Sequence, residues 1–174
     1  LTGKVAIITG GYQGIGRGIA EGLAEAGAQV VICARSFDKC VEACAAIGEK
    51  GVKTLPVRCD ITQKGEVESL VQKTVQEMGR IDILVNNAGV GGSEKPILKM
   101  SDEDWDHAVS IDLKGAFLLA RAVVPEMSKE GGGKIINVAS ITAMIAMPNM
   151  SAYCASKAGL VQLTKVMALE FIKY

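Results

Sequence analysis

A tyrosine and a lysine stand four residues apart in the segment Tyr-Cys-Ala-Ser-Lys, which ends at Lys157. On a helix, residues i and i+4 share one face, so the Lys157 ammonium can lie close to the Tyr153 phenol and favour its ionised form. Without such a neighbour a phenol is a poor base at neutral pH. The pair alone could be an ordinary solvated helix face. Together with Ser140 upstream and an early glycine-rich turn, it indicates hydride-transfer chemistry.

The glycine-rich turn contains Gly10, Gly14 and Gly16, between the first apolar run and the first stretch of helical period. These glycines permit a tight turn and let a pyrophosphate approach the backbone N–H groups at the helix N-terminus, whose partial positive charge favours an anion. Tight packing alone would also explain them. Their place directly after a strand favours a dinucleotide site.

The residues after the second and third strands bear on the choice of dinucleotide. Arg35 stands where an NAD-preferring protein would carry a ribose-reading carboxylate, so it can pair with a 2′-phosphate, which favours NADP over NAD. Gln13 adds no second charge, and an exposed arginine at a strand end is the alternative. Asp60 can accept a hydrogen bond from an adenine amino group while Ile61 packs on the ring. A capping carboxylate is the alternative there.

Short β-branched runs alternate with longer stretches of helical period, which is the pattern of βαβ units around a parallel sheet. We expect an α/β fold with a doubly wound, Rossmann-like sheet and one domain over residues 1–174. Strands buried on both faces are expected at Lys4–Thr9, Gln29–Cys33, Lys53–Arg58, Ile81–Val85 and Lys134–Val138. Helices are expected at Ile15–Ala26, Phe37–Lys50, Lys64–Met78, Asp102–Lys129 and Ala152–Tyr174. Because the last helix shows no C-cap, we expect the C-terminal part of the fold to be missing.

The composition excludes several classes of protein. The chain has 19 basic and 19 acidic residues, a balance that argues against a nucleic-acid or membrane-surface partner. No apolar run approaches the ~20 residues of a membrane span, and no signal peptide opens the chain. We therefore expect a cytoplasmic protein. Five cysteines without a Cys-x-x-Cys pair indicate neither a disulfide framework nor a metal site.

With these motifs in place, the chain resembles the short-chain dehydrogenase/reductase family from about Lys4 to its last residue. The glycine turn is similar to the family's glycine motif, Asp60 to its adenine contact, and Asn87, Ala88 and Gly89 to its Asn-Asn-Ala-Gly segment. Ser140, Tyr153 and Lys157 match its catalytic serine, tyrosine and lysine. The cofactor residues that we expect are Gly10, Gln13, Gly14, Ile15, Gly16, Arg35, Asp60, Ile61, Asn87, Ala88, Gly89, Tyr153 and Lys157.

The resemblance implies reversible oxidation of a secondary alcohol to a ketone with a nicotinamide cofactor. In reduction, Tyr153 would donate a proton to the carbonyl oxygen, Ser140 would hydrogen-bond that oxygen, and Lys157 would hold the ribose and stabilise the phenolate. It also implies a homodimer or homotetramer, with Trp105, Phe117 and Leu118 on the helix that meets the partner.

The chain departs from the family pattern at Asp112, where members usually carry asparagine. We count Asp112 with the catalytic residues and expect it to act through its backbone carbonyl, since a charged side chain in the site would carry a desolvation cost. The alternative is that its carboxylate interacts with Lys157 through water and weakens the effect of the ammonium on Tyr153. The second departure is length, because the family continues into further strands and a substrate-covering segment.

Other functions fit the sequence less well. A Ser-His-Asp hydrolase would need His107 beside Ser140, which its position on a polar, acidic helix disfavours. A methyltransferase would explain the glycines but not the spacing of Ser140, Tyr153 and Lys157. The main alternative is a catalytically silent NADP-binding sensor or scaffold of the same fold. The small-molecule substrate stays open, although the loops at 90–93 and 144–150 are expected to line its pocket.

Overall fold

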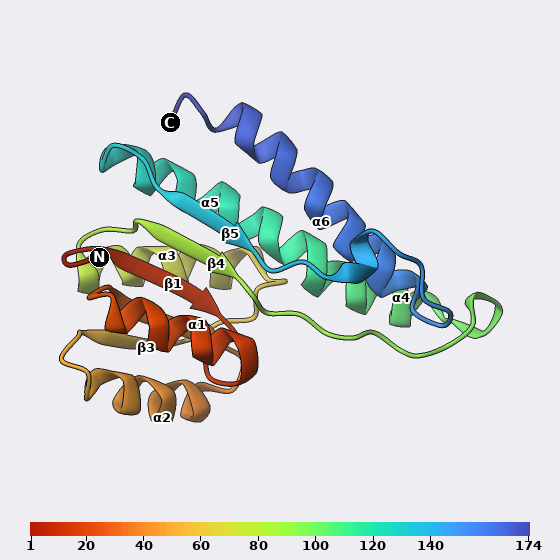
Figure 1. The fold of residues 1–174 in the computed structure, drawn as a ribbon, viewed down its shortest axis with the longest axis horizontal. Coiled ribbons are helices and arrows are strands. Elements are labelled where there is room, and N and C mark those ends of the chain that lie inside the picture. The colour runs from red at the N-terminus through yellow and green to blue at the C-terminus, as the bar shows by residue number, and fades with distance from the viewer.

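The computed structural model describes all residues from 1 to 174 and contains one parallel sheet (Figure 1). The strands lie in the order β3-β2-β1-β4-β5, so the chain starts in the middle, builds one half of the sheet and then crosses to the other. This arrangement confirms the expected doubly wound α/β fold. The strands are β1 Val5–Thr9, β2 Gln29–Ala34, β3 Thr54–Arg58, β4 Ile83–Asn86 and β5 Lys134–Asn137.

Helices cover both faces of the sheet because alternate residues of each central strand are apolar on opposite sides. Ile8 and Val85 pack with helices α1 (Gly14–Glu25) and α2 (Phe37–Gly48) on one face. Ile7 and Leu84 pack with α3 (Lys64–Met78) and α5 (Gly115–Lys129) on the other. The central strands therefore hold the core, and their carboxyl ends are fixed relative to the helices that follow them.

The two outer strands differ from the expectation of burial on both faces. In β5, Lys134 and Ile136 are exposed, and in β3 most residues are only half-buried. Each is an edge strand with one hydrogen-bonded neighbour in the sheet. Pro56 lies in β3, where an edge position tolerates its missing N–H group.

The segment expected as one helix over Asp102–Lys129 is divided in the structure. Helix α4 (Asp102–Val109) begins at a capping box, in which Ser101 Oγ accepts from Asp104 N at 3.2 Å. A π-helical turn at Ser110–Lys114 follows, and α5 continues from it. Such turns arise from one extra residue in a helical ladder and often occur at functional sites. A helical period read from sequence does not show the insertion.

Helix α6 (Ser151–Glu170) ends earlier than the expected Tyr174 and packs along α4 and the π-helical turn. Short 3-10 segments at Ile97–Lys99 and Ile141–Ala143 lie in the loops after β4 and β5. These two loops reach the end of the molecule where α4 and the start of α6 lie (Figure 1). None of the helices combines the length and apolar character needed to cross a membrane.

Candidate functional site

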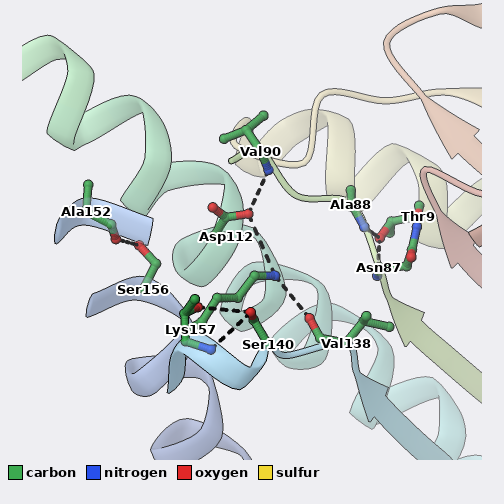
Figure 2. A network of polar contacts seen from close by, with 11 residues as sticks. Thr9, Asn87, Ala88, Val90, Asp112, Val138, Ser140, Ala152, Ser156 and Lys157 are labelled. Carbon is green, nitrogen blue, oxygen red and sulfur yellow. Dashed lines mark hydrogen bonds and ion pairs between the residues drawn. The ribbon is translucent and has the colours of Figure 1, made fainter. Parts of the chain in front are cut away.

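The carboxyl ends of β1 and β4 are joined by the buried hydroxyl of Thr9. This oxygen accepts hydrogen bonds from the backbone N–H groups of Asn87 at 3.0 Å and Ala88 at 2.9 Å. The Asn87 side chain returns the contact, since its Nδ2 donates to Thr9 O at 2.9 Å. The Asn87 amide therefore holds two strand ends together (Figure 2). Its neighbours Ala88 and Gly89 are thereby fixed beside the glycine turn.

The glycine turn is built by backbone conformation and by close packing. Gly10 has φ +64° and Gly14 has φ +54°, both in the region that favours glycine. A Cβ on Gly16 would lie 2.7 Å from Gly10 O and would collide with the Asn87 amide. Helix α1 starts here without a side-chain cap and without an acidic residue in its first turn. Its first N–H groups can therefore donate hydrogen bonds to an anion such as a pyrophosphate.

Around this turn, Gln13, Gly14 and Ile15 are exposed, as is Arg35 at the end of β2. These residues line an open surface at the N-terminus of α1 and the neighbouring strand end, where a dinucleotide can reach them. The structure thus fits a pyrophosphate at the turn, and Arg35 is exposed at the end of the neighbouring strand.

Asp60 and Ile61, the expected adenine contacts, have other partners in the structure. Asp60 Oδ1 accepts from Thr62 N at 2.9 Å and Thr62 Oγ1 at 2.7 Å, which is the capping arrangement named above as the alternative. Burial acts to raise the pKa of Asp60, but these hydrogen bonds and the charge of Arg35 lower it below its ordinary value. Ile61 is buried where α5 begins, and a Cβ on Gly115 would come within 2.6 Å of it. Its side chain is packed in the core, and its contact with an adenine ring stays a prediction.

Three segments meet at the Lys157 ammonium. Lys157 Nζ donates to Val138 O at 3.0 Å, where the chain leaves β5, and lies 5.6 Å from the centre of the Tyr153 ring. Ser140 follows Val138 by two residues and precedes the 3-10 segment. The lysine thus lies near the tyrosine of its own helix. Figure 2 shows its contact with Val138, at the strand end that leads to Ser140.

Ser140 has one hydrogen-bonding capacity left. Its Oγ accepts from Thr142 N at 3.2 Å and from Thr142 Oγ1 at 2.9 Å. A hydroxyl has two acceptor lone pairs and one donor hydrogen, so the hydrogen of Ser140 stays available for another oxygen.

Asp112 lies in the π-helical turn, and its side chain, not only its backbone, faces this site. Asp112 Oδ1 accepts from Val90 N at 2.9 Å and lies 3.9 Å from Lys157 Nζ. Burial raises the pKa of the Asp112 carboxyl against the opposing effect of the Val90 N–H and the Lys157 charge. Burial lowers the pKa of the Lys157 ammonium, and the Asp112 charge opposes this. The expectation of a backbone role did not include these contacts.

Sequence reasoning missed several residues that build the site. Thr9 and Thr142 supply the hydroxyls just described. Asn86 Nδ2 donates to Asn137 Oδ1 at 2.8 Å, and Asn137 Nδ2 donates to Thr164 Oγ1 at 2.8 Å. These two hydrogen bonds join β4, β5 and α6. The only sequence signal was polar side chains at the carboxyl ends of apolar strands. Nothing in the spacing indicated which of them would pair.

The comparisons with known proteins agree with one another. The family model described as short chain dehydrogenase matches residues 4–174. An uncharacterized oxidoreductase of Thermotoga maritima is 41% identical over all of this chain and 68% of its own length. An NAD-dependent glycerol dehydrogenase of Listeria innocua is 41% identical over all of this chain and 67% of its own length.

Solved structures give the same result. NAD+-bound xylitol dehydrogenase superposes with a TM-score of 0.96 at 34% identity, over 99% of this chain and 66% of that chain. A metagenomic short-chain oxidoreductase in complex with NADP gives 0.94 at 35% identity, over 99% of this chain and 78% of that chain. The chain spans about two thirds of the length of most of these relatives. By sequence and by structure, the chain belongs to the short-chain dehydrogenase/reductase family of oxidoreductases.

Proposed function

We propose that the protein interconverts a secondary alcohol and a ketone with a nicotinamide cofactor, with Tyr153 as the general acid and base. The observation that supports this most is the position of Lys157, whose Nζ lies 5.6 Å from the Tyr153 ring centre and 3.0 Å from Val138 O. This brings the phenol, the ammonium and the strand end of Ser140 to one place.

The residues divide the reaction as follows. Bound reduced nicotinamide supplies the hydride that reaches the carbonyl carbon. The Tyr153 phenol donates the proton to the carbonyl oxygen, and the free hydrogen of Ser140 bonds to that same oxygen and orients it. Lys157 favours the phenolate that remains and binds the cofactor ribose. In alcohol oxidation each proton moves in the opposite direction.

NADP is the proposed cofactor because Arg35 is exposed. It stands at the position where an NAD-preferring protein would carry a carboxylate that binds the ribose. Gly10, Gly14 and Gly16 hold the pyrophosphate at the start of α1. Relatives are named with each cofactor, since xylitol dehydrogenase was solved with NAD+ and the metagenomic oxidoreductase with NADP. NAD use would therefore change the partner of Arg35 and leave the mechanism as proposed.

The association of subunits is a further part of this proposal. Trp105 on α4 and Phe117 on α5 are each 41% exposed, which suits contact with a second copy. Leu118 was expected on the same surface but belongs to the buried core. We propose a homodimer or homotetramer, which the molar mass from light scattering tests.

The test of function is oxidation of NADPH and NADH by the purified protein against a panel of sugar-acid, polyol-derived, 3-oxoacyl and steroid-like ketones. Turnover with at least one ketone is expected. The Tyr153→Phe variant should bind NADPH as the unmodified protein does, because phenylalanine is only slightly smaller than tyrosine. It should lose turnover, because it lacks the hydroxyl that donates the proton. NADPH binding without turnover of any ketone would instead support the silent sensor or scaffold, and a Tyr153→Phe variant that keeps most of its kcat would refute the role of the tyrosine.

A further inference from the structure

The carboxylate of Asp112 is enclosed in the fold. Its side chain has no exposed surface, and that of Lys157 is 6% exposed. The π-helical turn that carries Asp112 packs tightly against its neighbours at both ends. A Cβ on Gly115 would meet Ile61, and one on Gly159 would lie 3.0 Å from a methyl group of Leu113. The turn has little room to move, so the direction of the Asp112 side chain is set by packing.

The two carboxylate oxygens have different surroundings. Oδ1 accepts from Val90 N and faces Lys157 Nζ, as described above. Oδ2 is buried without a hydrogen-bond partner. A buried carboxylate with one unpartnered oxygen is costly for stability alone, because its lost hydration is only partly replaced. This cost is consistent with a residue retained for its charge.

Gly89 shows how closely the loop after β4 lies over the pair. A Cβ at this position would lie 2.6 Å from Asp112 Oδ1 and 3.3 Å from Lys157 Nζ. The backbone of Gly89 and Val90 thus covers the carboxylate and the ammonium together. The titratable groups near Asp112 are Lys157 from α6 and His107 from α4, and Tyr153 faces Lys157 along α6.

We propose, building on the function proposed above, that Asp112 is a positioning residue whose carboxylate fixes the loop at Val90 and holds the Lys157 ammonium. Its negative charge partly offsets the charge of Lys157. Lys157 therefore favours the ionised phenol of Tyr153 less strongly than it would beside a neutral residue. Asp112 touches neither the substrate nor the cofactor in this scheme and acts through Lys157.

The test compares Asp112→Asn with the unmodified protein in the direction of ketone reduction. Asparagine keeps an oxygen that can accept from Val90 N, removes the charge and puts an NH2 group in place of the second oxygen. The basic limb of the kcat/KM profile should move to lower pH by on the order of one unit, because the uncompensated Lys157 then favours the phenolate more strongly. Asp106→Asn, on the exposed face of α4, removes the same charge and should leave the profile in place.

Gly89→Ala perturbs the same pair from the other side, and it serves if Asp112→Asn does not fold. Its methyl group should displace the carboxylate from Lys157 and move the limb in the same direction. Gly65→Ala, in α3 and outside the site, is the control, because a Cβ there also meets nothing within 4 Å. Thermal unfolding of all four variants identifies any that are misfolded.

A second measurement separates this inference from the proposed function. NADPH affinity, followed by the fluorescence of the reduced nicotinamide, should fall at high pH as Lys157 loses its proton, and in Asp112→Asn that fall should begin at lower pH. If the unmodified protein turns over no ketone, the proposed function fails while the binding curves still test the pair. Coincident pH dependence of Asp112→Asn and the unmodified protein, in rate or in binding, overturns the role of the charge.

Discussion

Gly16→Ala tests whether the glycine turn is as closely packed as the structure shows. Gly16 lies in the first turn of α1, where an added Cβ would lie 2.7 Å from Gly10 O and 3.0 Å from Asn87 Cγ. Asn87 Nδ2, which donates to Thr9 O, would be closer still. A Cβ does not pack at such distances, so we expect α1 to move away from the sheet and the Asn87 side chain to leave Thr9.

The expected cost combines two losses and one gain. Overpacking of this kind costs about 1–3 kcal/mol, and the lost Asn87 hydrogen bond about 0.5–1.5 kcal/mol. Alanine in a helix gains up to about 1 kcal/mol over glycine. The net effect is a loss of about 1–3 kcal/mol in the free energy of unfolding. Gly18→Ala, in the same helix with nothing within 4 Å of its Cβ, receives the gain alone.

Urea unfolding of the two variants measures this difference, which we expect to be about 2–4 kcal/mol. With a typical slope of about 2 kcal/mol/M, the midpoints should differ by about 1–2 M. NADPH affinity should fall in Gly16→Ala, because movement of α1 withdraws the N–H groups from the pyrophosphate, and stay unchanged in Gly18→Ala. If both variants became more stable together, the close approach of α1 to Asn87 would be refuted.

Three further predictions follow from single residues. Lys157→Ala should weaken NADPH binding and slow turnover together, and a change in one parameter alone would contradict its double role. Arg35→Asp should erase or reverse a preference for NADPH of about ten- to a hundredfold, measured as the ratio of the two dissociation constants. Asp82, bonded to Arg80 and Lys4, has a pKa of about 2 despite the opposing effect of burial. Because its folded pKa is depressed, it should contribute about 2 kcal/mol of stability above about pH 4, lost as the pH falls toward 2, and Asp82→Asn should flatten urea midpoints across that range.

The architecture could be predicted because its causes are local and repeated. Apolar strands alternate with helical periods along the whole chain, and Gly27, Gly51 and Gly79 follow helices with φ between +82° and +90°, as expected of helix ends. The outer strands were predicted less well. β3 and β5 each carry a charged residue and fewer apolar residues than the central strands, and their place at the sheet edges, which is a property of the topology, leaves them less buried.

The candidate site could be predicted as a set of residues but not as a set of partners. The spacing of the glycines and the interval between Tyr153 and Lys157 are short-range patterns, so they can be recognised in the sequence. The contacts of Asp112 depend instead on a one-residue insertion in the helix, on two glycines that admit the turn and on Val90, which lies 22 residues earlier in the chain. From the sequence, the cost of desolvation argues against a buried carboxylate in such a site. In the structure, the Val90 N–H and the Lys157 ammonium contact the Asp112 carboxylate and offset part of that cost. Asp112, which the sequence led us to expect to act through its backbone, is thus the residue whose side-chain contacts could be found only in the folded structure.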